Sequence, residues 1–173
     1  LRLKIVKLIM NAKEGHIPSS LSIVDILNYI YKNKVKYNSK KNDYFILSKG
    51  HGCVALYVVL NKYNLLSDKI LNSYGSNGSI LGGHPDSTKI KNIEASTGSL
   101  GHGLPTATGI ALGLKIKNQK NKVYCLIGDG ECHEGSIWEA ASISANLKLD
   151  NLVCLLDWNK SAQQLIKIEN LKK

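Results

Sequence analysis

The sequence predicts an α/β protein with a doubly wound parallel sheet flanked by helices. Two short apolar runs, Val123–Ile127 and Leu152–Leu156, each break into a polar turn. Between them, residues 136–148 have the length of a helix and carry small residues that allow close packing. Buried parallel strands have this almost continuous apolar character, and strand, helix, strand is the repeating unit of such a fold.

A third strand is expected at Tyr44–Leu47, followed by a glycine-flanked turn and the apolar helix 53–63. The turn 15–22 contains serines that can cap a helix running from about Ser22 to Tyr31. A lysine- and asparagine-rich connection over 31–43 is predicted to be solvated. Further helices are predicted over residues 1–13, from 67 to a stop at Gly75, and over 105–117.

Composition limits the possible functions. The 173 residues are enough for one domain, and the net charge is +10. That charge would suit nucleic acid, but Arg2 is the only arginine and no aromatic residues alternate with the scattered lysines, so we expect no nucleic-acid role. No apolar run approaches the roughly 18 residues that a membrane span needs, and no signal peptide is visible, so we expect no membrane association.

The four cysteines form no Cys-x-x-Cys pair. Cys125 and Cys154 fall inside predicted strands, and we expect both to be buried apolar residues in a reducing, cytoplasmic compartment. Cys132 lies beside a polar turn, where a filler role is favoured over an oxidisable one.

Polar side chains follow the two strands at 123–127 and 152–156. Asp129 comes directly after the first, and Asn159 follows the second, thirty residues later. Ligands of parallel sheets bind outside the carboxyl ends of the strands. The glycines at 128, 130 and 135 do not form the dinucleotide fingerprint, because His133 stands at its third glycine. A carboxylate facing phosphates needs a cation between them, which predicts a diphosphate cofactor held through Mg²⁺. The alternative is a Gly-Asp-Gly hairpin turn without a ligand.

Three histidines lie in turns rich in glycine, proline or serine. His51 stands between two glycines, which allow a backbone to approach a ligand closely, and its imidazole can donate to phosphate. His16 and His84 precede or lie beside prolines, and each could equally be a surface histidine. Residues 96–105 form a fourth glycine-rich turn before a helix, whose free amides can hold an anion or the polar edge of a heterocycle. Helix packing is the alternative reason for its glycines.

Together these segments resemble the transketolase family of thiamine-diphosphate enzymes. The run Gly-Asp-Gly-Glu-Cys-His-Glu-Gly at 128–135, followed about thirty residues later by asparagine, carries the resemblance, and the four other turns occur in the family's order. The sequence departs from the family's pattern at several places. Ile17-Pro18 replaces Pro-Gly, Ser99 a proline and His102 a glutamine, and residues 161–173 lack the usual Asp-Gly ending.

The resemblance implies a thiamine-diphosphate-binding fold and a role for each matched residue. Metal binding, to Mg²⁺ or Ca²⁺, is implied for Asp129, Asn159 and the carbonyl of Ser161. For the cofactor, it implies contacts with the diphosphate and ring region from His51, Gly98, Ser99, Leu100, Gly130 and Asn159. Reaction with the sugar is implied for His16 and His84, and a position at the interface between subunits for Glu134.

The implied reaction moves a two-carbon ketol unit from a ketose phosphate to an aldose phosphate, as in the pentose phosphate pathway of carbohydrate metabolism. Residues 1–173 would form a single diphosphate-binding domain, incomplete at its C-terminal end, from a split enzyme or a longer chain. Activity would require a pyrimidine-binding partner section in a homo- or hetero-oligomer. A deoxyxylulose-phosphate synthase, a 2-oxoacid dehydrogenase component and a non-catalytic remnant are the alternatives. The run 131–135 and the pair His16 and His84 favour transketolase.

Overall fold

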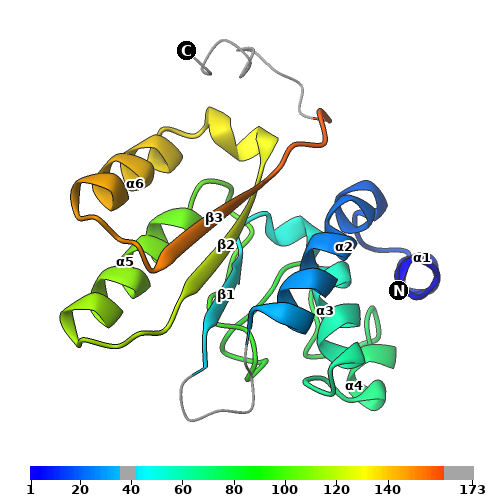
Figure 1. Cartoon of the computed structure of the whole chain (residues 1–173). Coiled ribbons are helices and arrows are strands. Elements are labelled where there is room, and N and C mark those ends of the chain that lie inside the picture. The colour runs from blue at the N-terminus through cyan, green and yellow to red at the C-terminus, as the bar shows by residue number, and fades with distance from the viewer. Residues whose placement is uncertain (36–41, 162–173) are drawn as a thin grey trace.

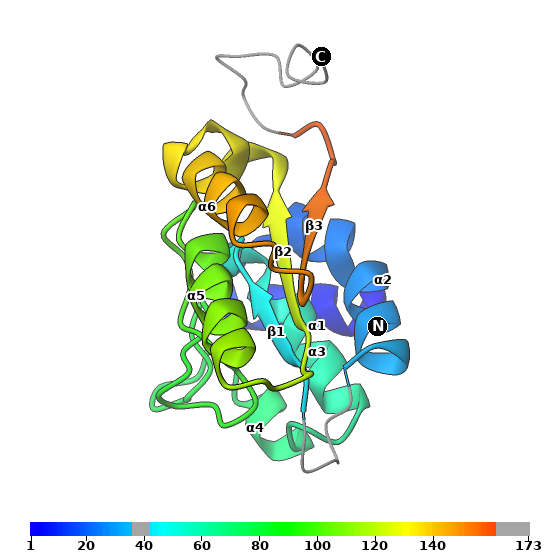
Figure 2. The ribbon, with the colours of Figure 1, turned by 60° about the vertical axis from the view of Figure 1, so that its left-hand side comes forward.

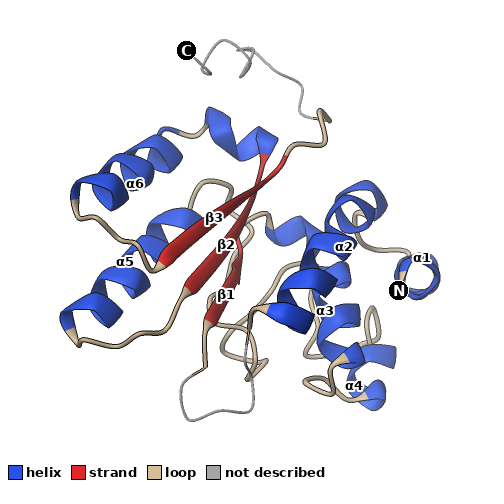
Figure 3. Cartoon of the chain, in the orientation of Figure 1, coloured by secondary structure: helices blue, strands red, loops and turns tan. Residues whose placement is uncertain are grey.

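The computed structural model describes residues 1–35 and 42–161. Part of the predicted connection 31–43 and nearly all of the tail 161–173 lie outside these residues. Three strands form one parallel sheet in the order β1 (Tyr44–Leu47), β2 (Val123–Gly128) and β3 (Leu152–Asp157), as Figures 1 and 3 show. All three lie where the apolar runs predict them, and the predicted α/β class is confirmed.

Helices cover both faces of this sheet (Figures 1 and 2). One face carries two helices, α5 (Gly103–Ile116) and α6 (Gly135–Asn146). The other side carries four, α1 (Arg2–Ala12), α2 (Ile17–Asn33), α3 (Cys53–Lys62) and α4 (Asp68–Asn72). None of the helices in the described part of the chain has the length and apolar character needed to cross a membrane.

Alternate residues of each strand pack into separate cores. In β2, Tyr124 and Leu126 join the cluster formed by α1, α2 and α3, whereas Cys125 and Ile127 join the cluster formed by α5 and α6. Successive strand residues point to opposite faces, so a strand covered on both sides must be apolar at every position. This is why β2 is buried along its whole length.

The register aligns the carboxyl ends of the strands. Leu47 pairs with Leu126, and Gly128 pairs with Asp157. The chain leaves β1 through a 3₁₀ turn at Gly50–Gly52 and leaves β2 through another at Asp129–His133. The turns that carry the predicted site residues therefore meet at one edge of the sheet.

The start of α2 differs from the prediction. The helix begins at Ile17, not at Ser22, and the serines lie inside it rather than capping it. His16 is the N-cap, and its Nδ1 accepts a hydrogen bond from the Ser19 amide at 3.2 Å. Pro18 is compatible with this earlier start, because the first helical turn tolerates proline. An imidazole thus takes the capping role that the sequence assigned to hydroxyls.

The predicted burial of the strand cysteines is half right. Cys125 in the central strand is buried, but Cys154 is exposed. Within the described residues β3 pairs only with β2, so one of its edges has no neighbouring strand. Cys132 is buried, as expected for a filler, and all four cysteines are free thiols.

Candidate functional site

A cavity of about 340 Å³ opens at the carboxyl ends of the strands. It is lined by backbone and side chains from all three strand-end turns and from the start of α2. Seven predicted site residues lie on its wall: His16, His51, Leu100, Asp129, Gly130, Asn159 and Ser161. Residues spread over more than 140 positions of the sequence therefore converge on one hollow.

Asp129 provides the site with a buried acceptor. The residue is only 4% exposed, and its Oδ1 accepts a hydrogen bond from the Gly130 amide at 2.9 Å. Its Oδ2 is buried without a hydrogen-bond partner among the described residues. Burying a carboxylate oxygen unpaired costs free energy, so native proteins normally provide such an atom with a donor or a cation. The Asp129 carboxylate therefore fits a metal ligand.

Asn159 is held in one orientation by its neighbours. Its Nδ2 donates to Oδ2 of Asp157 at 2.9 Å, which leaves Oδ1 as the acceptor end of the amide. Oδ1 accepts from both the amide and the hydroxyl of Ser161. Carboxylate, amide and carbonyl oxygens are the ligands of Mg²⁺ and Ca²⁺. The described residues contain no cluster of three or more His, Cys, Asp or Glu side chains that could hold a metal, and the predicted oxygen set does not need one.

A buried ion pair beneath this site is absent from the sequence prediction. Lys49 Nζ lies 2.6 Å from Oδ2 of Asp157, and the two side chains are 3% and 7% exposed. The hydroxyl of Ser22 also donates to Asp157 Oδ2, at 2.7 Å, which ties α2 to the end of β3. The available signal was an aspartate ending the apolar run of β3, two residues before Asn159. Ser19 of the cavity wall was also missed.

The histidines give the cavity an electropositive side without full charge. The rings of His16 and His51 meet edge to face, with centroids 5.2 Å apart. The pKa of His51 is lowered to about 4, mainly by burial, and the neighbouring groups Lys49, His16 and His84 act in the same direction. At neutral pH the His51 imidazole is therefore uncharged, and it can donate one hydrogen bond to an anion.

This pKa makes stability depend on pH. In the unfolded chain His51 should titrate near ~6.5, so the unfolded state binds more protons between about pH 6.5 and pH 4. The stabilising contribution of neutral His51 is then complete above about pH 6.5 and is lost as the pH falls. We expect His51→Gln to lose less stability than the unaltered protein between pH 7 and pH 5, as urea midpoints would measure. His133→Gln, which alters an exposed histidine, is the control. Equal slopes for all three proteins would contradict the assignment.

The remaining predicted residues border the cavity or lie outside it. Gly98 has a φ of +147°, and a Cβ placed on it would lie 2.6 Å from Cδ2 of His84, so the His84 ring packs directly on this glycine. His84 and Ser99 are exposed at the rim. Glu134 is exposed and lies against Gly101, where an added Cβ would be 2.7 Å from the Cβ of Glu134.

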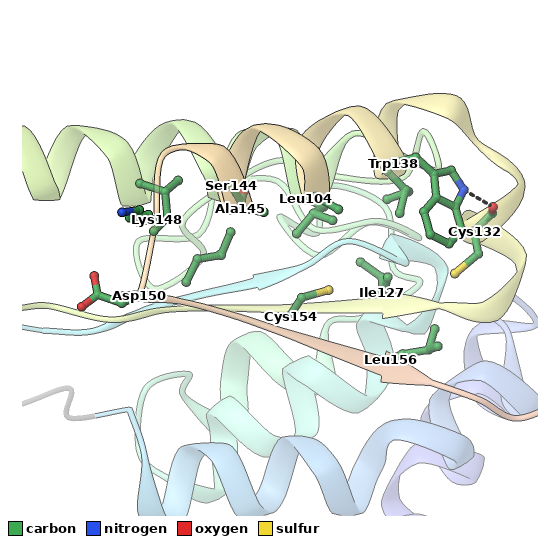
Figure 4. A pocket seen from close by; sticks show the side chains of 14 residues that line it. Leu104, Ile127, Cys132, Trp138, Ser144, Ala145, Lys148, Asp150, Cys154 and Leu156 are labelled. Atoms are coloured by element: carbon green, nitrogen blue, oxygen red, sulfur yellow. Dashed lines mark hydrogen bonds between the residues drawn. The ribbon is translucent and has the colours of Figure 1, made fainter. Parts of the chain in front are cut away.

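A larger cavity, of about 590 Å³, lies between α6 and β3 on the other side of the β2 turn (Figure 4). Its wall is mainly apolar and includes Leu104, Ile127 and Leu156. The indole of Trp138 donates to the Cys132 carbonyl at 2.9 Å. Burial raises the pKa of the Cys132 thiol, and it raises that of Cys154 to about 11, so neither is a thiolate at neutral pH. This groove lacks the polar groups that a charged cofactor needs.

Comparison with known proteins agrees with this geometry. The family model for the transketolase thiamine diphosphate binding domain matches residues 1–164. One of the two subunits of the apulose-4-phosphate transketolase of Phocaeicola vulgatus is 38% identical over 99% of this chain and 64% of its own length. Human transketolase is 38% identical over 94% of this chain and 27% of its own length.

Solved structures show the same relationship. The transketolase of Campylobacter jejuni superposes with a TM-score of 0.79 at 29% identity, over 99% of this chain and 29% of that one. The Leishmania mexicana enzyme gives 0.79 at 28% identity, over 90% of this chain and 26% of that one. This chain thus spans only part of each of these proteins. From the strand-end cavity to the matched sequence, the chain belongs to the transketolase family and corresponds to its thiamine diphosphate binding domain.

Proposed function

We propose that this chain forms the diphosphate-binding half of a transketolase, which transfers a two-carbon ketol unit from a ketose phosphate to an aldose phosphate. The observation that carries the proposal is the buried, partnerless Oδ2 of Asp129 beside Asn159 on the wall of one cavity. In a chain of this family, an unpaired carboxylate oxygen at the strand ends is where a metal would join the protein to a diphosphate.

The residues present fit both parts of the cofactor. Asp129, Asn159 and the carbonyl of Ser161 would hold Mg²⁺ or Ca²⁺, and His51 and Gly130 would contact the diphosphate. Gly98, Ser99 and Leu100 would lie along the ring region. Thiamine diphosphate, when bound, supplies the stabilisation of the carbanion, and the protein binds and orients.

The protein's own chemical contribution would come from its imidazoles. Neutral His51 donates a hydrogen bond to the diphosphate without adding charge to it. His16 and His84 are exposed at the mouth of the cavity, where they would exchange protons with sugar hydroxyls. The capping bond from the Ser19 amide to His16 Nδ1 fixes that ring, so that Nε2 is its free nitrogen.

The rest of the active site would come from a partner. Two relatives, from Phocaeicola vulgatus and Actinobacillus succinogenes, are each named as one subunit of an apulose-4-phosphate transketolase, and they are matched over 64% and 60% of their lengths. We propose that residues 1–173 act as one diphosphate-binding domain beside a pyrimidine-binding section, in a homo- or hetero-oligomer with exposed Glu134 at the interface. The four free thiols favour a reducing, cytoplasmic location, and a place in carbohydrate metabolism follows from the reaction.

The test is to assay ketol transfer by the full-length protein with and without its partner section. With thiamine diphosphate and Mg²⁺, we expect turnover only from the assembled pair. Activity from this polypeptide alone would contradict the need for a partner. Assembly that binds cofactor without turnover on any ketose phosphate would instead identify a non-catalytic remnant.

A further inference from the structure

Glu131 is a buried carboxylate that the proposed mechanism does not use. It lies in the 3₁₀ turn after β2 and is 1% exposed. The ion pairs formed by residues 1–35 and 42–161 do not include it. A buried carboxylate without a cationic partner persists only where neutral donors satisfy both oxygens.

Three donors surround Glu131, and they come from three separate segments. Its Oε1 accepts from the Ser48 hydroxyl at 2.6 Å and from the Gly101 amide at 2.9 Å. Its Oε2 accepts from the Gly128 amide at 3.0 Å. Ser48 follows β1, Gly128 ends β2, and Gly101 belongs to the loop before α5. One carboxylate therefore joins two strand ends to a loop that reaches the cavity.

The strand ends have other support, but the loop has little. The Ser48 amide donates to Leu126 across the β1–β2 ladder at 2.9 Å, and Gly128 pairs with Asp157 of β3. The peptide of Gly101 is instead held by side chains from the β2 turn and α6. Glu131 binds its amide, and the Ser136 hydroxyl donates to its carbonyl at 2.8 Å.

The loop segment 98–100 is suspended between two such anchors. At its other end, the hydroxyl of Thr97 donates to the Leu47 carbonyl at 2.6 Å. Leu100 lies on the cavity wall, and Gly98 packs against His84. The position of residues 98–100 in the cavity is thus set by their fixed ends, of which the Gly101 end depends on Glu131.

We propose that Glu131 is a positioning residue that fixes the loop 98–101, and through it the affinity for the ring portion of thiamine diphosphate rather than for the diphosphate. The inference rests on the proposed function. Metal and diphosphate are held at Asp129 and Asn159, so the two halves of the ligand depend on different anchors.

Glu131→Gln tests this with little change of shape. In either orientation of the new amide, its NH₂ faces a backbone N–H, of Gly101 or of Gly128, and the charge that strengthens all three bonds is lost. The ladder keeps the strand ends in place, so the displacement should fall on the loop. Ser48→Ala is a second, milder variant that removes one donor and keeps the carboxylate.

The measurement is calorimetric binding to the full-length protein assembled with its partner section, in the presence of Mg²⁺. The two probes are thiamine diphosphate and inorganic pyrophosphate. We expect Glu131→Gln to weaken thiamine diphosphate by about tenfold or more, the size of one lost hydrogen bond to a charged group, and to leave pyrophosphate within about threefold. Ser48→Ala should act in the same direction with a smaller effect. Glu139→Gln, which removes an exposed charge on α6, should change neither.

Each other outcome overturns the proposal at an identifiable step. Equal weakening of both probes would mean that Glu131 supports the whole site and does not position the loop. Unchanged thiamine diphosphate affinity in both variants would mean that the loop does not depend on this carboxylate. If the unaltered assembly binds pyrophosphate but gains nothing from the thiamine ring, the proposed function itself fails.

Discussion

Replacing Asp129 with asparagine should abolish metal-dependent cofactor binding and still leave the metal-free protein at least as stable as before. Oδ2 of Asp129 is buried without a partner among the described residues, so it carries a desolvation penalty in the absence of a cation. Removing that charge should raise the free energy of unfolding by up to about 1–3 kcal/mol. The same change removes the only carboxylate of the proposed ligand set. The loss of cofactor affinity should exceed the roughly 100-fold that follows when an outer partner of a metal ligand is lost.

Calorimetry with thiamine diphosphate, with and without Mg²⁺, measures the first effect. Thermal unfolding in a chelator measures the second. Asp150→Asn alters an exposed carboxylate at the opposite end of the strands and should change neither quantity. A variant that is destabilised without metal, or that retains Mg²⁺-dependent binding, would show that Asp129 is a structural residue.

The fold could be predicted where the sequence pattern is set by local geometry. β2 and β3 were predictable because a strand covered on both faces must be apolar at each position, and Cys125 confirms this. Cys154 has the same kind of sequence around it but is exposed, because the burial of a strand depends on whether another strand lies beside it. No property of residues 152–157 contains that information.

The site could be predicted where turn residues have few structural reasons to occur. Asp129, Asn159 and His51 follow strands, and the parallel register brings them to one cavity. Lys49 and Glu131 were missed because their roles come from contacts with residues 108 and 83 positions away in the sequence. A lysine in a turn and a glutamate beside a glycine look like solvated charges until the chain has folded.

Removing Lys49 alone should produce the largest loss of stability among the single changes considered. Its ammonium is 3% exposed and lies 2.6 Å from Oδ2 of Asp157, whose side chain is 7% exposed. Lys49→Met would leave the Asp157 carboxylate buried with no cation. Breaking such a pair costs about 3–5 kcal/mol, because an uncompensated charge remains in a low-dielectric interior. Urea unfolding at neutral pH measures the difference.

The double variant Lys49→Met/Asp157→Leu separates folding from ligand orientation. Replacing both partners of a buried pair by apolar residues of similar size is often neutral or stabilising, so most of the lost stability should return. The exposed pair Arg2 and Asp25, 54% and 79% exposed at 2.7 Å, is the matched control. Its double replacement, Arg2→Met/Asp25→Leu, should change stability by less than about 1 kcal/mol.

The restored fold should still bind metal poorly. Asp157 Oδ2 is the acceptor that holds the Nδ2 end of the Asn159 amide, and leucine offers no acceptor in its place. The amide can then turn, and its oxygen is no longer fixed toward the site of the cation. We expect the double variant to lose about 10- to 100-fold in Mg²⁺-dependent cofactor affinity, as when a partner behind a metal ligand is removed. If stability and affinity return together, the ion pair serves only the fold. If affinity stays low while stability returns, Asp157 orients the Asn159 ligand.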